Sequence, residues 1–271
     1  MLLRRFVLAV LAATALLLLW LFAIWPPPLW YRTHWPAETA FMAMRSHRPG
    51  APHVRSYRPV PLDSISPALV QAVLIGEDNR FWTHPGIDFV EIRRALGYRG
   101  PAFSWTSGRD LADVTRSLGR AWARRDALRG ASTISQQLAK NLYLSPSRNP
   151  LRKLKEAVTA LRLEGALDKR RILELYLNVV EMGDGVGGAE AAGETYFNRS
   201  AAALDRQQAA ALAGALPFPL LSNPAFHPAR MRWRQSLILR RMGGERIEIP
   251  AVDSLPDSLP APAEPLPPDP G

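Results

Sequence analysis

The chain of 271 residues contains no cysteine. A disulfide framework and a thiolate metal site are therefore excluded, because both need cysteine sulfur. The sequence also has few strand signals, no internal repeat and no recognisable nucleic-acid-binding motif. After a short N-terminal apolar segment and a tail, about 220 residues remain, which is enough for one large domain or two closely packed lobes.

Acidic residues are scarce outside the C-terminal end. The chain has 34 Lys and Arg against 24 Asp and Glu, a formal net charge of +10. Residues 245–271 hold six acidic side chains and one arginine, net −5, so the rest of the chain carries +15. Such a body can meet nucleic acid, an anionic lipid surface or an anionic substrate. Aromatic residues do not alternate with Lys and Arg, which argues against nucleic acid. With the apolar N-terminal segment present, lipid and lipid pyrophosphate are the better interpretations.

One long hydrophobic run is present. Residues 6–25 carry no charge and have the length that spans a bilayer as a helix. Arg4 and Arg5 precede the run, so the positive-inside rule places residues 1–5 in the cytoplasm and the rest of the chain outside. The alternative is a cleaved signal peptide. The run is long for one and no clear small-x-small site follows it, so we expect an uncleaved anchor in the cytoplasmic (inner) membrane.

The remainder divides into three parts. Residues 26–61 are Pro-rich without strong periodicity and are predicted to be a linker, residues 62–244 to form the folded domain, and residues 245–271 to be a disordered, Pro-rich acidic tail. Apolar periodicity and capping residues predict a mainly α domain. The expected helices cover residues 67–77, 88–96, 132–144, 151–167, 169–180, 205–216 and 228–242, and residues 183–188 are expected to form a glycine-rich turn.

A basic amphipathic stretch covers residues 110–128. Its apolar residues recur on one helical face and its arginines lie off that stripe. A helix in the lipid headgroup region has this pattern. The alternative is a helix whose stripe packs on the folded domain.

Two glutamates stand in surroundings that favour group transfer. Glu77 closes the predicted helix 67–77, and Glu156 follows Arg152 by four residues on the predicted helix 151–167. Separate carboxylates with cations and amides between them suit the transfer of a sugar from a phosphate. One carboxylate can take the proton of the attacking hydroxyl. The Lys and Arg side chains can hold the departing phosphates by charge-assisted hydrogen bonds.

Each candidate also has a plain structural alternative. Glu77 could be a surface helix end, and Arg152 with Glu156 a solvated i,i+4 ion pair. His84 taken alone is more often a hydrogen-bonded structural histidine. Residues 136–141 could be a polar helix face. In the buried helix 169–180, structural hydrogen bonds would satisfy Glu174 and Asn178.

Four sequence blocks occur in order. The pattern Glu-Asp-x-x-Phe-x-x-His-x-Gly is met at Glu77, Asp78, Phe81, His84 and Gly86. Gly-x-Ser-Thr-Ile-x-Gln-Gln is met over residues 130–137, and Arg-Lys-x-x-Glu at Arg152, Lys153 and Glu156. Lys-x-x-Ile-Leu-Glu-x-Tyr-Leu-Asn is met over residues 169–178. Over residues 62–239 the chain resembles the peptidoglycan glycosyltransferase family, the polymerase module of class A penicillin-binding proteins and of monofunctional transglycosylases.

The resemblance implies a fold and a reaction. The fold is lysozyme-like, with a larger head and a smaller membrane-associated jaw. The substrate is lipid II, a disaccharide-peptide on undecaprenyl pyrophosphate, and the growing lipid-linked glycan. The 4-hydroxyl of the acceptor N-acetylglucosamine attacks the anomeric carbon of the donor N-acetylmuramic acid. The pyrophosphate leaves, and a β-1,4 bond forms with inversion.

The resemblance also implies roles for residues. Glu77 is the general base, and the pyrophosphate is neutralised by Lys140, Arg152 and Lys153. Neutral hydrogen bonds to sugar or phosphate come from Ser132, Thr133, Gln136, Gln137 and Asn141. The supporting residues are Asp78, Phe81, His84, Gly86, Glu174, Tyr176 and Asn178. No covalently bound cofactor is expected. Two roles are open for Glu156: it orients Arg152 and Lys153, or it holds a divalent cation, Mg²⁺ or Mn²⁺, that bridges the phosphates.

The sequence departs from the family pattern at three places. Gly187 stands where an aromatic residue is usual, Asn198-Arg199 stand where Gly-Lys is usual, and residues 97–129 look longer than the typical connection. None of these removes a catalytic-type residue. No transpeptidase domain fits after Leu239, so no peptide cross-linking is expected from this chain, although transpeptidases and other wall-synthesis proteins are candidate partners.

Two other functions compete with polymerisation. A muramidase or lytic transglycosylase would need an acid carboxyl and no pyrophosphate cradle, and the Lys and Arg cluster argues against it. A non-enzymatic membrane scaffold for wall-synthesis proteins fits the Pro-rich tail, but the four intact blocks argue against it.

Overall fold

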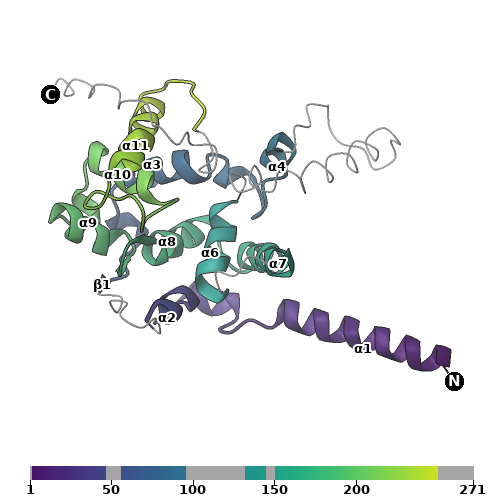
Figure 1. Ribbon diagram of the computed structural model, residues 1–271. Helices are drawn as coiled ribbons and strands as arrows, with labels where there is room; N and C mark the ends of the chain where they lie inside the picture. The colour runs from purple at the N-terminus through teal and green to yellow at the C-terminus, as the bar shows by residue number, and fades with distance from the viewer. Residues whose placement is uncertain (1, 47–55, 96–131, 145–149, 250–271) are drawn as a thin grey trace.

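The computed structural model describes residues 2–46, 56–95, 132–144 and 150–249, and within these ranges it is mainly helical (Figure 1). The predicted amphipathic helix at residues 110–128 and the predicted tail beyond residue 249 lie outside the described residues.

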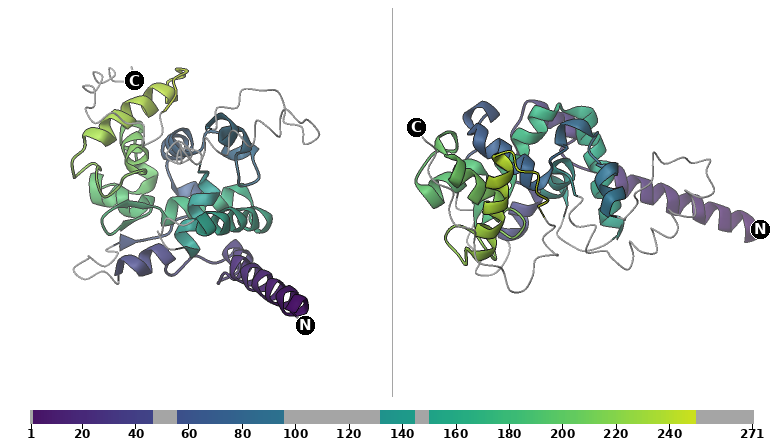
Figure 2. Two further views of the ribbon diagram at one scale, coloured as in Figure 1. Left: turned by 45° about the vertical axis from the view of Figure 1, so that its right-hand side comes forward. Right: turned by 90° about the horizontal axis from the view of Figure 1, so that it is seen from above.

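The N-terminal apolar helix is confirmed, with shifted ends. Helix α1 covers Leu2–Phe22 and projects from the body of the protein on the side of α7 (Pro150–Ala166) (Figures 1 and 2). Its residues Leu3–Phe22 are long and apolar enough to cross a membrane. The last carbonyls of α1 are capped by basic side chains of α7, because Arg162 Nη1 donates to the Phe22 oxygen at 2.7 Å and Lys155 Nζ donates to the Ala23 oxygen at 3.1 Å. Helix α1 therefore ends on the folded domain.

The predicted linker at residues 26–61 differs from what the structure shows. It contains a 3-10 helix at Pro28–Arg32, the helix α2 at Ala40–Ser46 and the strand β1 at Ser56–Tyr57. Tyr31 is 2% exposed and belongs to the main hydrophobic core. Arg171 of α8 (Lys169–Val179) donates from Nε to the Tyr31 oxygen at 2.7 Å. These elements are too short to give a periodic signal, so tertiary contacts determine their structure.

The helices predicted within residues 62–244 are confirmed, with ends displaced by a residue or two. They are α3 (Pro67–Glu77), α4 (Phe89–Ala95), α6 (Ile134–Tyr143), α7 (Pro150–Ala166), α8 (Lys169–Val179), α10 (Arg206–Ala215) and α11 (Ala229–Met242). The caps explain their starting points. The side chain of Asp168 accepts from Arg171 N at 2.7 Å, and Asp88 accepts from Val90 N at 2.9 Å.

Two groups of helices meet at a central one. Helices α3, α10 and α11 pack together on one side, and α6 and α7 lie on the other (Figure 1). Helix α8 lies between the groups and is buried over most of its length, as its apolar sequence predicts. Close packing of α10 on α11 depends on Gly214, where a Cβ atom would lie 2.8 Å from the Met231 oxygen.

A small sheet and one further helix were not predicted. Strand β3 (Val186–Gly187) pairs in parallel with β1 and antiparallel with β2 (Glu181–Gly183), and α9 covers Ala189–Phe197. The strands are too short to show alternation. Two positions that depart from the family pattern, Gly187 and Asn198, lie in this region. Gly187 lies in β3 opposite Tyr57, and Asn198 ends α9 at φ 53°, a left-handed conformation that asparagine tolerates in place of glycine.

Candidate active site

Glu77 is a largely buried carboxylate at the C-terminal end of α3. Its side chain is 9% exposed. Gln137 Nε2 donates to its Oε2 at 2.9 Å, and Arg234 Nη2 lies 3.3 Å from its Oε1. Burial raises the pKa of Glu77, while the Arg234 charge and the Gln137 hydrogen bond act in the opposite direction. A carboxylate with a raised pKa accepts a proton more readily than an exposed one, which suits a general base.

The amide of Gln137 is held in one orientation by Tyr176. The Tyr176 hydroxyl donates to Gln137 Oε1 at 3.0 Å, so the Gln137 NH₂ group faces Glu77. Burial raises the pKa of Tyr176 well above its ordinary value, so the phenol stays protonated and remains a donor. A hydrogen-bonded chain therefore runs from α8 through α6 to the carboxylate on α3.

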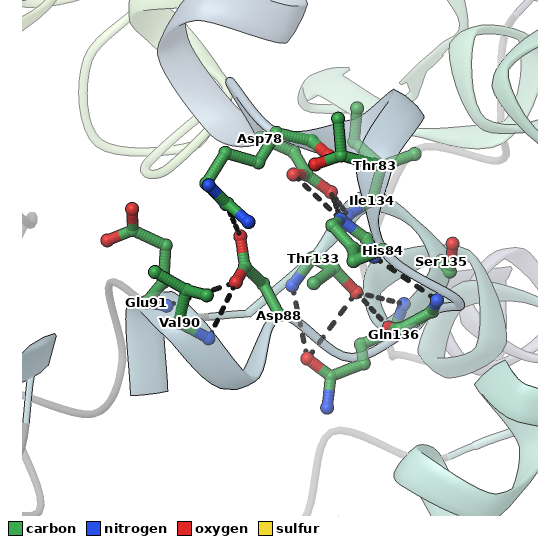
Figure 3. Close-up of polar contacts among 12 residues, drawn as sticks. Asp78, Thr83, His84, Asp88, Val90, Glu91, Thr133, Ile134, Ser135 and Gln136 are labelled. Carbon is green, nitrogen blue, oxygen red and sulfur yellow. Dashed lines mark hydrogen bonds and ion pairs between the residues drawn. The ribbon is translucent and has the colours of Figure 1, made fainter. Parts of the chain in front are cut away.

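The turn after Glu77 is tied to the start of α6 by Asp78 and His84 (Figure 3). Gly86 N donates to His84 Nδ1 at 3.1 Å, which leaves Nε2 to donate to Asp78 Oδ1 at 3.0 Å. The same carboxylate accepts from Ile134 N at 2.9 Å. Both side chains are buried, so the structural role that was open for His84 is the one observed. This network fixes Glu77 relative to α6.

Thr133 and Gln136 form the N-terminal capping box of α6 (Figure 3). Thr133 N donates to Gln136 Oε1 at 3.1 Å, and Gln136 N donates to Thr133 Oγ1 at 3.2 Å. The Thr133 hydroxyl also donates to the Gly86 oxygen at 2.6 Å. In this structure both side chains hold the start of α6, and their contact with substrate stays a prediction. Gly86 has φ +98°, where a side chain would be strained.

A cation cluster surrounds the second glutamate. Glu156 of α7 is 3% exposed, Arg152 Nη1 lies 2.9 Å from its Oε2, and Lys153 Nζ pairs with its Oε1. The Arg152–Glu156 pair is therefore buried on the carboxylate side. It is not the solvated i,i+4 ion pair that was the structural alternative. Lys153 Nζ also donates to Ser132 Oγ at 2.9 Å, which joins α7 to the segment before α6.

Lys140 lies on α6 between the two carboxylates. Burial lowers the pKa of Lys140, Glu156 and Glu77 raise it, and Lys153 and Arg152 lower it. The structure thus brings Lys140, Arg152, Lys153, Glu156 and Ser132 together, as the sequence blocks predict, and connects this cluster with Glu77 through α6. Such preorganised cations suit the stabilisation of a departing anion.

The other predicted site residues lie in supporting positions. Phe81 is fully buried, with Lys169 Nζ 4.3 Å from its ring centroid. Asn141 is 6% exposed on α6, and its contact with substrate stays a prediction. Glu174 Oε1 accepts from Leu62 N at 2.8 Å.

Asn178 bonds both backbone groups of Val60, accepting from its N at 2.8 Å and donating to its oxygen at 2.9 Å. Glu174 and Asn178 therefore hold residues 60–62 on α8, which is the structural alternative for both.

The residues at Glu156 do not fit a protein-held metal ion. Both carboxylate oxygens are taken by Arg152 and Lys153. Across the described ranges, no group of three or more His, Asp or Glu side chains is placed to hold a metal. A divalent cation at Glu156 would have to displace one of the two basic side chains. The cation stays a prediction, tested by adding Mg²⁺ or Mn²⁺ to the assay.

A pocket of about 730 Å³ opens beside Glu77. One wall is the turn at residues 77–80 with Ser132 and Thr133, and the other is the C-terminal segment 244–249. The predicted tail therefore differs from the structure over its first residues, since Ile249 packs against the main core and Ile247 is half-buried.

One residue in contact with Glu77 was not predicted. Arg234 is 3% exposed on α11, a helix that none of the four blocks includes. A signal for its burial is present in the sequence, because Met231, Arg234 and Ile238 follow the i, i+3, i+7 spacing of one helical face and are all buried.

Comparisons with known proteins agree with the site. The family described as Transglycosylase matches residues 47–102 and 100–243. A biosynthetic peptidoglycan transglycosylase of Azoarcus sp. (strain BH72) is 42% identical over 225 residues, 81% of this chain and 87% of that protein. This chain is also similar to two further proteins of the same name. The one from Bordetella pertussis is 40% identical over 90% of this chain and 93% of its own length, and the one from Rhodospirillum centenum is 43% identical over 89% of this chain and 90% of its own length.

Proposed function

We propose that this chain, which belongs to the transglycosylase family and has its lysozyme-like glycosyltransferase fold, polymerises lipid II into peptidoglycan glycan strands. The names of its relatives support peptidoglycan glycosyltransferase activity. The observation that carries the proposal in the structure is the pairing of a buried carboxylate, Glu77, with a separate cation cluster on the adjoining helices.

The reaction forms one bond and breaks another at the anomeric carbon of the donor sugar. The acceptor 4-hydroxyl oxygen forms a bond to the anomeric carbon of N-acetylmuramic acid while the bond from that carbon to the pyrophosphate oxygen breaks. The hydroxyl proton passes to Glu77, which is placed as general base. The pyrophosphate leaves with the electron pair, and attack from the opposite face inverts the α link to β-1,4.

The cations act on the leaving group. Negative charge grows on the pyrophosphate as the bond breaks, and Lys140, Arg152 and Lys153 are already held together where α6 meets α7. Their placement costs no reorganisation at the moment of reaction. Glu156 fixes the positions of Arg152 and Lys153 through its two oxygens, which is the first of the two roles open to it.

A glycan-cleaving enzyme is not favoured. It would need a second carboxyl that protonates the leaving sugar oxygen. The other buried glutamate of this site, Glu156, is instead ion-paired with two basic side chains. A scaffold without activity would give no reason for a largely buried carboxylate and a half-buried lysine in one site.

The proposed location is the outer face of the cytoplasmic membrane. Arg4 and Arg5 keep the N-terminus of α1 inside, and the rest of the chain lies outside. A protein lacking residues 1–22 should polymerise lipid II in detergent and work poorly on lipid II liposomes, because α1 confines enzyme and substrate to one surface. Equal activity of both forms on liposomes would reject this role for α1.

The test of the activity uses purified full-length protein in detergent. Labelled lipid II is supplied with and without Mg²⁺ or Mn²⁺, and the products are sized on a gel. Finished glycan is offered in a parallel reaction. Lengthening of lipid II supports the proposal, and cutting of the finished glycan would identify a hydrolase instead.

A further inference from the structure

Helix α11 supplies a buried arginine to the back of Glu77. Arg234 Nη2 donates to the Gly76 oxygen at 2.9 Å and lies 3.3 Å from Glu77 Oε1. The Gly76 carbonyl is one of the last of α3, where an α-helix leaves its carbonyl groups without intrahelical donors. One guanidinium therefore holds both the end of the helix and the carboxylate that the helix presents.

Among the residues that the structure describes, two cations act on Glu77 and offset its burial. The groups facing it are Arg234 from α11, Gln137 and Lys140 from α6, Asp78 in the next position, and Tyr176 from α8. Arg234 is the largest of the influences that lower the Glu77 pKa, Lys140 acts in the same direction more weakly, and Asp78 opposes them. Burying a charge pair whose members come from α3 and α11 costs desolvation free energy. Its presence beside the proposed base therefore points to a role in the reaction.

We propose that Arg234 is a positioning residue for the general base: it fixes the Glu77 carboxylate against the end of α3 and keeps it ionised at the pH where the enzyme works. This inference rests on the proposed function, because Glu77 acts as the base there. Arg234 does not touch the reacting atoms in this account. Its effect on the reaction passes through Glu77.

The sign of the expected pH effect follows from the charge. A cation beside a carboxylate favours the ionised form and lowers its pKa. Without the Arg234 charge the Glu77 pKa rises, so the base is protonated up to a higher pH. The acid limb of the pH profile of kcat/KM then moves to higher pH, while KM for lipid II changes little.

The experiment compares full-length variants by pH profile of lipid II polymerisation. Arg234→Met removes the charge and keeps the length of the side chain, and Arg234→Lys keeps a charge. Arg232→Met is the matched control, since Arg232 is exposed on the same helix. Arg234→Met should move the acid limb up by about one pH unit, the lower end of the shift that an arginine causes. Arg234→Lys should restore most of that shift, and Arg232→Met should leave the limb in place.

A second readout does not depend on turnover. The Glu77 carboxyl is titrated by ¹³C NMR in protein labelled at glutamate, with the signal assigned by its loss in Glu77→Gln. A higher Glu77 pKa in Arg234→Met than in Arg232→Met supports the inference. An equal pKa in both overturns it, whether or not the protein polymerises lipid II. If wild-type protein polymerises nothing while the titration shifts, the proposed function fails and the inference about the Glu77 charge stands.

Folding is checked by thermal melting of each variant. Should Arg234→Met fail to fold, Arg234→Gln replaces it, because its amide can still donate to the Gly76 oxygen while the charge is gone. An acid limb and Glu77 titration unchanged in Arg234→Gln would then overturn the inference.

Discussion

The two buried glutamates of the site differ in how they are held. Glu156 has its cations on its own helix, three and four residues earlier, and each of its oxygens is ion-paired. Glu77 has its partners on α6 and α11, with one longer contact to a cation and one hydrogen bond from an amide. The same side chain is thus used to arrange positive charge in one place and to handle a proton in the other.

Helix α6 is what relates the two regions. It carries Gln137 toward Glu77, and Lys140, one turn later, toward the Glu156 cluster. Its start is fixed by Asp78, which directly follows Glu77 in the chain. A substitution at one glutamate can therefore affect the other region through α6. Measuring turnover and stability separately for each variant distinguishes an effect on the reaction from an effect on the fold.

The largest effect is expected from Glu77→Gln. The amide has nearly the same shape but cannot accept the proton, so turnover should fall by about 10²–10⁴-fold, the usual contribution of a general base. Because the amide is nearly isosteric, lipid II binding should change little, whereas the melting temperature should fall, since the buried Arg234 loses its carboxylate partner. The measurement is turnover and lipid II binding of the purified variant. Near-normal turnover would remove Glu77 from the role of base.

Lys140→Ala and Glu156→Gln should separate charge in the reaction from charge in the fold. Lys140→Ala removes a cation that burial already disfavours, so turnover should fall by about 10²-fold, as for loss of one preorganised donor, with little change in melting temperature. Glu156→Gln leaves Arg152 and Lys153 without their carboxylate, so both turnover and melting temperature should fall.

The fall in stability is limited by solvent, since the Lys153 side chain is 48% exposed. The two variants are compared by turnover and thermal melting in one buffer. Wild-type turnover in both would place the leaving-group cradle elsewhere. A large loss of stability in both would leave only the structural role of the ion pairs.

The sequence predicted the Glu156 side of this comparison better than the Glu77 side. Arg152, Lys153 and Glu156 lie within one helical turn, so their spacing alone places them together. Arg234 lies 157 residues from Glu77 in the chain, and only the packing of α11 on α3 brings the two into contact. The predicted helices followed from apolar periodicity and caps.

The elements that were not predicted depend on tertiary contacts. Strands of two or three residues show no alternation. The residue before α9 is Gly188, whose φ of +84° and close approach to the Asn178 oxygen are not indicated by any local sequence pattern. The sequence blocks also did not show that some of their residues have structural roles. Thr133 and Gln136 look like substrate ligands in a motif, yet their side chains cap α6.

Tyr176→Phe should have a smaller effect on the Glu77 side. It removes only the hydroxyl that donates to Gln137 Oε1, so the amide is no longer held with its NH₂ group toward Glu77. A net hydrogen bond is worth about 0.5–1.5 kcal/mol, so turnover should fall about two- to twelvefold. Gln137→Ala serves as the comparison, because it removes the same contact to Glu77. If Tyr176→Phe loses stability and keeps full turnover, Tyr176 supports the core and does not orient the base.

Ser132→Ala should have the smallest effect, on the Glu156 side. Lys153 Nζ loses its hydrogen bond to Ser132 Oγ and keeps its ion pair with Glu156. Because Lys153 is partly exposed, water replaces the lost acceptor, and turnover should fall only about twofold, the low end for one hydrogen bond. The assay is lipid II turnover at saturating substrate. A loss as large as that of Lys140→Ala would mean that the Ser132 hydroxyl itself bonds the substrate, which would make Ser132 a ligand and not a support for Lys153.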